Sequence, residues 1–146
     1  MRMKVSVEGG LTVKQAIQKF DADSVKVIQG VIDSSAQNIR NHAIRSIKNS
    51  PATGRTYKRG SVSHTASSAG NPPKSDTGRL VGTISASVGE LEAEIGAYAE
   101  YSSHLEFGTR NMSARPFMFP ALEQERKTFM NRMDRAIKTA VSKGGK

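Results

Sequence analysis

The sequence predicts an α+β fold, in which a long N-terminal helix and a C-terminal helix pack on a small antiparallel β-sheet. Apolar residues recur every three or four positions across residues 25–47 and again after Pro120, as on the buried stripe of a helix. Between these segments, apolar and polar residues alternate across residues 84–97, as in a strand with one buried face. The length of 146 residues suggests one domain spanning residues 1–146.

Two helices are predicted in the first third of the chain. Residues 11–20 carry apolar side chains at helical spacing and predict a short amphipathic helix. Residues 21–50 predict a long helix, for which Asp21, Asp23 and Ser24 are candidate caps and Pro51 supplies the stop. Gly30 lies inside this helix, where glycine costs up to about 1 kcal/mol relative to alanine. A close contact with another helix would explain this glycine.

Residues 51–76 predict a long, flexible, basic arm. Glycine, proline, serine and threonine dominate the segment, and no hydrophobic periodicity runs through it. Arg55, Lys58 and Arg59 are candidates to face DNA or a partner ring, because cations neutralise phosphates without reading the base sequence. An ordinary solvated loop is the alternative for this segment.

Residues 81–99 predict a β-hairpin that turns at Gly89 and Glu90. Its outer face is expected to be polar and acidic, because glutamates alternate with the apolar residues of the second strand.

A constrained connector follows the hairpin and leads into the C-terminal helix. One or two helical turns should end at a glycine, and a proline should lie in the first turn of the last helix. The apolar side chains are expected to anchor the connector to the core, and its glycine and proline to fix the turns. The connector residues are Leu105, Phe107, Gly108, Phe117, Phe119 and Pro120. At the far end of the last helix, residues 142–146 are expected to fray.

The net charge of +9 invites an anionic partner, but the charge is unevenly distributed. Residues 48–80 carry six bases against Asp76 alone, a net charge of +5. Residues 81–107 carry five glutamates and no base, a net charge of −5. A protein that packs against copies of itself could use both signs.

The composition argues against several other classes of protein. The chain has no cysteine, which excludes disulfides and cysteine metal sites, and it contains no apolar run of transmembrane length. No signal peptide, nucleophile elbow or Walker lysine motif is apparent. His104 and Glu106 are spaced as a metal-ligand pair but have no evident third ligand. We therefore expect no catalytic residue, no metal, no cofactor and no membrane partner.

Four segments together resemble a family of phage proteins. The resemblance is carried by "SDTGRLVGTISASV" at the start of the hairpin, "YAEYSSHLEFGT" after it, "ARPFMFPAL" at the last helix, and the arm "TYKRGSVSHTASSAGNPPKSDTG". In order and spacing they are similar to the lambdoid-type tail-completion, or head–tail connector, proteins of long-tailed double-stranded DNA phages and prophages. The chain departs from the family pattern at Val81 and Gly82.

The resemblance implies a structural virion protein and not an enzyme. Such a subunit would assemble as a ring, which we expect to be a hexamer, at the head-proximal end of the tail. It would join tail to head, contact neighbouring neck and tail-tube proteins, and line the passage for double-stranded DNA. It would pass through the host cytoplasm during assembly and end in the virion.

Ring assembly suggests a role for the charged residues of the connector, because each copy needs two complementary surfaces. Glu106 is predicted to lie at a subunit boundary and to pair with Arg110 or Arg115 of the neighbouring copy. Closure of a monomer core is the simpler reading of the connector. For the whole chain, the alternative function is that of a small, basic DNA-binding protein without sequence specificity.

Overall fold

A computed structural model describes residues 1–5 and 15–144 of the chain. The predicted helix over residues 11–20 lies partly outside this range, and residues 15–18 of it are helical. The elements are β1 (Arg2–Val5), α2 (Ala22–Lys48), β2 (Thr56–Arg59), β3 (Val62–Thr65), α3 (Arg79–Gly82), β4 (Ile84–Gly89), β5 (Glu92–Ala97), α4 (Ser102–Phe107) and α5 (Met118–Gly144).

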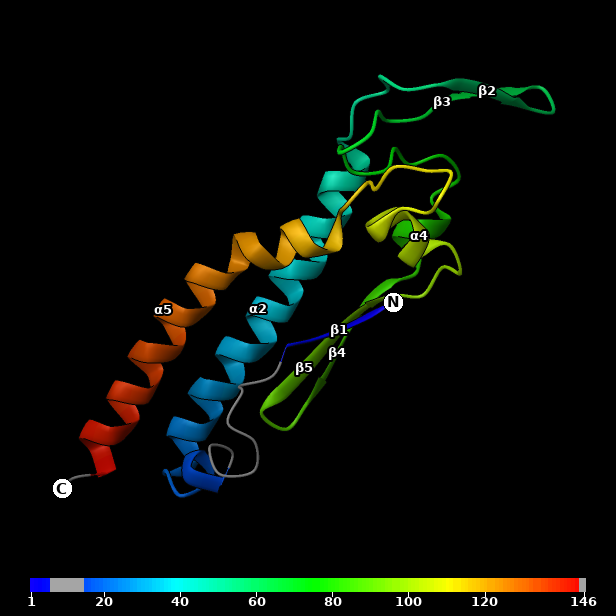
Figure 1. The fold of residues 1–146 in the computed structure, drawn as a ribbon. Helices are drawn as coiled ribbons and strands as arrows, with labels where there is room; N and C mark the ends of the chain where they lie inside the picture. The colour runs from blue at the N-terminus through cyan, green and yellow to red at the C-terminus, as the bar shows by residue number, and fades with distance from the viewer. Residues whose placement is uncertain (6–14, 145–146) are drawn as a thin grey trace.

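The long helices and the main sheet form two layers, which confirms the predicted α+β fold (Figure 1). Helices α2 and α5 lie side by side and run in opposite directions, and α2 also contacts β4 and β5. The main sheet has the strand order β1-β5-β4, with both pairs antiparallel. Ile28 and Ile47 of α2, Ile95 of β5 and Phe117 are among the fully buried side chains of the core.

Strand β1 is an addition to the predicted hairpin. Its four residues pair with β5, and Met3 lies opposite Ile95. A strand this short at the chain start leaves little periodicity to detect, since alternation needs about four to eight residues to be visible. The N-terminal ammonium group also donates a hydrogen bond to the Ala97 carbonyl, which ties the start of the chain to the sheet.

Helix α2 matches the predicted long helix in position and cap. The Asp21 carboxylate accepts hydrogen bonds from the Ser24 hydroxyl and the Ser24 backbone N–H. The hydrogen bond from the Ser24 hydroxyl, and to a smaller degree that from the Ser24 N–H, lowers the pKa of Asp21 below its usual value. Both bonds favour the charged form of the carboxylate. Gly30 meets no helix contact, since a Cβ built there would have no neighbour within 4 Å. The expected packing reason for Gly30 is therefore wrong.

A buried carboxylate joins the two long helices. Glu125 of α5 is 4% exposed and accepts hydrogen bonds from the Ser35 hydroxyl at 2.9 Å and the Asn38 amide at 3.2 Å. Both donors lie on α2, so the contact is satisfied only when the helices lie in one register. Further along α5, Arg132 donates to the Ser34 hydroxyl of α2 at 2.7 Å. These polar contacts fix how α5 lies along α2.

Part of the arm forms secondary structure that the sequence does not predict. Residues 56–65 form a two-stranded hairpin, β2–β3, in which Tyr57 lies opposite His64 and Gly60 adopts a φ of 60° at the turn. Alternation over only four residues in each strand is hard to separate from loop composition, so the sequence analysis did not predict this hairpin. In Figure 1 this hairpin stands out from the body beyond the end of α2.

The C-terminal helix is longer at both ends than predicted. It begins at Met118, so Pro120 is its third residue and lies in the first turn as expected. It continues to Gly144, so residues 142–144 are helical and not a frayed tail. Residues 145 and 146 lie outside the described part of the chain.

Candidate interaction surfaces

The connector is held to α5 by Glu106. This residue is 4% exposed, and its carboxylate accepts hydrogen bonds from the backbone N–H groups of Phe117 at 2.9 Å, Met118 at 3.0 Å and Phe119 at 2.7 Å. The first N–H groups of a helix have no partner within the helix and carry partial positive charge. Glu106 therefore caps α5 from a position in α4.

The cap overturns the predicted role of Glu106 at a subunit boundary. A carboxylate that is buried and bonded to three N–H groups of its own chain is not available to a base of a neighbouring copy. Arg110 is exposed, and Arg115 lies at the base of the arm, so neither is paired with Glu106. The position of Glu106 between two apolar residues suggested a subunit boundary. It did not reveal that the carboxylate binds the N–H of Phe117, 11 residues away.

The apolar connector residues divide into two groups. Phe117 is fully buried and Leu105 packs against the core, so both anchor the connector as predicted. Phe107 is 74% exposed and Phe119 is 57% exposed, so the prediction that these rings are core anchors is wrong. Gly108 adopts a φ of 76°, and a Cβ there would meet the backbone of the following turn at 2.8 Å, so this position favours glycine.

The base of the arm is fixed to the body by backbone contacts. The Gly54 N–H donates to the Ala66 carbonyl at 2.7 Å, and the Ala66 N–H donates to the Arg55 carbonyl at 3.1 Å. A Cβ on Gly54 would collide with the Ser67 backbone, so the two sides of the arm approach as closely as glycine permits. The Ser50 hydroxyl also donates to the Pro72 carbonyl at the end of α2.

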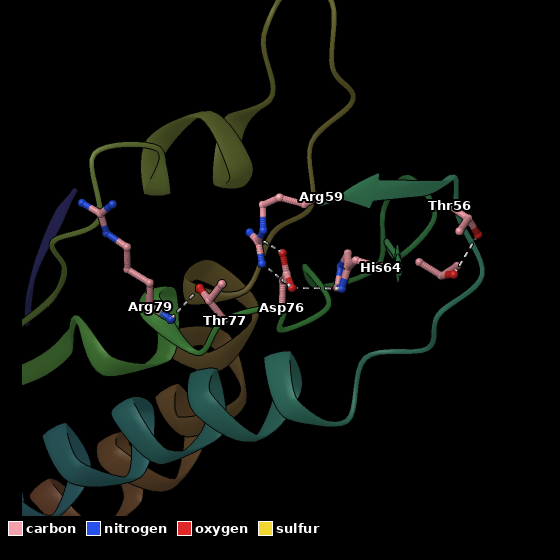
Figure 2. A network of polar contacts seen from close by, with 7 residues as sticks. Thr56, Arg59, His64, Asp76, Thr77 and Arg79 are labelled. Atoms are coloured by element: carbon pink, nitrogen blue, oxygen red, sulfur yellow. Dashed lines mark hydrogen bonds and ion pairs between the residues drawn. The ribbon is translucent and has the colours of Figure 1, made fainter. Parts of the chain in front are cut away.

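Charged side chains hold the hairpin against the segment that follows it. Asp76 lies between Arg59, with a closest N–O distance of 2.9 Å, and His64 Nδ1, at 3.6 Å (Figure 2). The side chains of His64 and Asp76 are 13% and 23% exposed, so the contact is largely shielded from water. Arg79 follows nearby, with its guanidinium pointing away from Asp76 in Figure 2.

A cavity of about 550 Å³ lies beneath the hairpin. Its lining includes four basic residues, Arg59, Lys74, Arg79 and Arg115, and a single acidic residue, Asp76. Side chains from β2, β3, the segment before α3, α4 and the connector meet there, although they are far apart in the sequence.

The outer face of the main sheet is less acidic than its composition suggests. Glu94 of β5 pairs with Arg2 of β1 at 3.4 Å, and the Arg2 guanidinium lies 5.8 Å from the centre of the Tyr98 ring. The Tyr98 ring covers Gly96, where a Cβ would meet it at 2.7 Å. Glu90, at the β4–β5 turn, accepts a hydrogen bond from Gln18 at 3.1 Å. The polar face predicted from the alternation is present, but its charge is partly neutralised.

The three arm bases predicted to face DNA or a partner differ in their surroundings. Arg55 and Lys58 are exposed and have no carboxylate within ion-pair distance among the residues the structure describes. Arg59 is bound to Asp76. The structure instead brings Arg59 together with Arg115 at the cavity.

Most of the residues that line the cavity were not named as site residues from the sequence. Ser67, Asp76 and Arg79 lie in a segment rich in turn-forming residues, where no periodicity indicates which side chains point inward. Only the long-range folding of the arm onto the connector brings them together.

Across residues 1–5 and 15–144, no cluster of three or more His, Asp or Glu side chains could hold a metal ion. No helix in the described part of the chain is long and apolar enough to cross a membrane.

Comparison with known proteins adds no relative. The chain matches no known family model, no curated protein and no solved structure.

Proposed function

We propose that this chain is a structural subunit, not an enzyme, that assembles as a ring at the head-proximal end of the tail of a double-stranded DNA phage. In this role it joins tail to head and lines the passage for DNA. The proposal rests on the resemblance of its motifs to tail-completion proteins and on the shape of the arm.

The projecting hairpin is the observation that carries the proposal. All four residues of β2 are exposed, and Tyr57 and Val62 are 46% and 54% exposed. An isolated two-stranded hairpin is only marginally stable in water, and its open edges can pair with another chain. A hairpin held out from the body therefore suits a contact with a neighbouring molecule.

Exposed apolar side chains also occur on the body. Phe107 at the end of α4 and Phe119 at the start of α5 are both largely in water. A ring requires two different surfaces on each copy, one fitting the other on the next copy. The arm and the surface around Phe107 and Phe119 supply two such surfaces.

Exposed bases on the arm supply a lining for DNA. Arg55 and Lys58 can neutralise phosphates without contacts to bases, which suits DNA that must slide through a channel. The same observation favours a second candidate, a small basic DNA-binding protein. The two differ in assembly, because a DNA-binding protein of that kind needs no closed ring.

Cross-linking from the arm tests the assembly. The chain has no cysteine, so Val62→Cys introduces a single site for a benzophenone label. In assembled particles, we expect illumination to give a ladder of multimers of this chain that ends at one closed size. Val141→Cys, on the exposed end of α5, is the matched control, which should cross-link far less to other copies. Labelled arms that attach only to DNA, with no multimers of the chain, would contradict the ring.

A further inference from the structure

The cavity beneath the hairpin holds more positive charge than the chain neutralises. Asp76 is already bound to Arg59 and lies beside His64. Arg79 and Arg115 have no carboxylate within ion-pair distance in the described ranges, and Lys74 reaches only a backbone carbonyl at 3.4 Å. Three cations at this cavity therefore lack an anionic partner.

Two polar atoms at the cavity are also buried without a hydrogen bond. They are the Ser67 hydroxyl oxygen, on a residue that is 0% exposed, and the Nε of Arg115. A buried polar group without a partner costs free energy, about 1–3 kcal/mol and more when it is charged. Both atoms are shielded from solvent, so a ligand in the cavity would meet the outer nitrogens of Arg115 and not the Ser67 hydroxyl.

The walls of the cavity are not uniformly charged. Leu80, Leu105 and Met112 supply apolar surface beside the cations, and the rings of Tyr57 and Tyr101 complete the lining. The volume of about 550 Å³ lies in the range of ligand sites, which is roughly 300–1,000 Å³. Such a site fits a few side chains of a peptide, whereas duplex DNA presents its phosphates on a broad surface that cannot enter.

We infer that this cavity is a docking site for an acidic segment of a partner protein. One or more Asp or Glu side chains would bind the guanidinium groups of Arg79 and Arg115, and an adjacent apolar side chain would contact Leu105. Carboxylates bind guanidinium groups through strong, charge-assisted hydrogen bonds. That this partner is a neighbouring protein of the phage neck rests on the proposed function. Binding of an acidic peptide does not depend on assembly, so the two proposals can fail separately.

Nuclear magnetic resonance with a synthetic peptide tests this inference on the purified full-length chain. The probe is acetyl-Glu-Leu-Glu-Glu-Leu-Glu-amide, and the matched control replaces every Glu with Gln. We expect the acidic peptide to give saturable shifts of the backbone amides of Ser67, Thr77 and Arg115, and the Gln peptide to give none. Arg79→Ala should weaken binding about tenfold, the equivalent of one lost charge-assisted hydrogen bond.

Two variants keep the result interpretable. Arg79 is exposed and has no side-chain partner among the described residues, so Arg79→Ala should leave the fold intact. Arg126→Ala removes an exposed arginine from α5, away from the cavity lining, and should bind the peptide as the parent chain does. The inference is overturned if the acidic peptide causes no saturable shift, or if the Gln peptide binds equally well. It is also overturned if short duplex DNA shifts the same amides at lower concentrations than the peptide.

Discussion

The carboxylate of Glu106 accepts a hydrogen bond from the backbone N–H of Phe117 at 2.9 Å. The same carboxylate also binds the next two N–H groups, so α4 and the start of α5 are held in one arrangement. The Arg115 N–H donates to the Leu105 carbonyl at 2.7 Å and closes the same loop from its other side. The connector is therefore fixed within one subunit, before any neighbour is present.

Replacing Glu106 with glutamine should destabilise the subunit by about 1–3 kcal/mol, because a charged acceptor at a helix N-terminus is lost and the new amide meets N–H donors. Thermal or urea unfolding measures the change. Glu100→Gln is the matched control, since Glu100 is exposed, and it should shift the free energy of unfolding by less than about 0.5 kcal/mol. Equal stability of the two variants would show that the cap is unimportant.

The two phenylalanines near this cap should respond in opposite ways to truncation. Phe117→Ala removes a fully buried ring and should cost about 3–5 kcal/mol. Phe107→Ala removes a ring that is 74% exposed and should change the free energy of unfolding by less than about 0.5 kcal/mol. If Phe107→Ala folds normally but no longer joins tails, this ring contacts a partner. Unfolding of Phe107→Ala would contradict its exposed position.

Two glycine-to-alanine substitutions should have effects of opposite sign. Gly30→Ala places a methyl group in open space on a helix and should stabilise the chain by up to about 1 kcal/mol. Gly54→Ala forces a methyl group against the Ser67 backbone and should cost roughly 1–3 kcal/mol at the base of the arm. Unfolding curves for both, with hydrogen exchange at the Ala66 amide for the second, measure these effects. Stabilisation by Gly54→Ala would mean that the arm base is looser than described.

Hydrogen exchange should be faster in the arm than in the long helix. The hairpin strands are four residues each and mostly exposed, whereas α2 contributes many of the buried residues of the core. The backbone amides of Thr56 and Thr65, which lie opposite each other in the hairpin, should therefore exchange well before those near Ile39. Protection of the hairpin equal to that of α2 in the isolated chain would contradict a mobile arm.

The parts of the fold that the sequence predicts well are those with long, regular patterns. The stripe from Ile28 to Ile47 and the alternation from Ile84 to Ala97 each repeat often enough to identify an element. Asp21 was identifiable as a cap because it acts within one turn, on Ser24. Short elements without repeats, such as β1 and the β2–β3 hairpin, were not.

The candidate site was much less predictable, because it depends on contacts between distant segments. The sequence does not reveal that Glu106 binds the backbone N–H groups of residues 117–119, and so it suggested that the carboxylate lies at a subunit boundary. Phe107 and Phe117 look alike in the sequence, and only the folded chain shows that one ring faces water and the other the core. The cavity beneath the arm has no local pattern at all.

The central claim is that this chain joins phage tails to heads, and counting particles tests it most directly. The gene is deleted from the genome that encodes it, the chain is supplied in trans, and joined particles are counted by electron microscopy. We predict separate heads and tails after deletion and joined particles after complementation with the parent chain. Joined particles in normal numbers without the chain would contradict the proposed function.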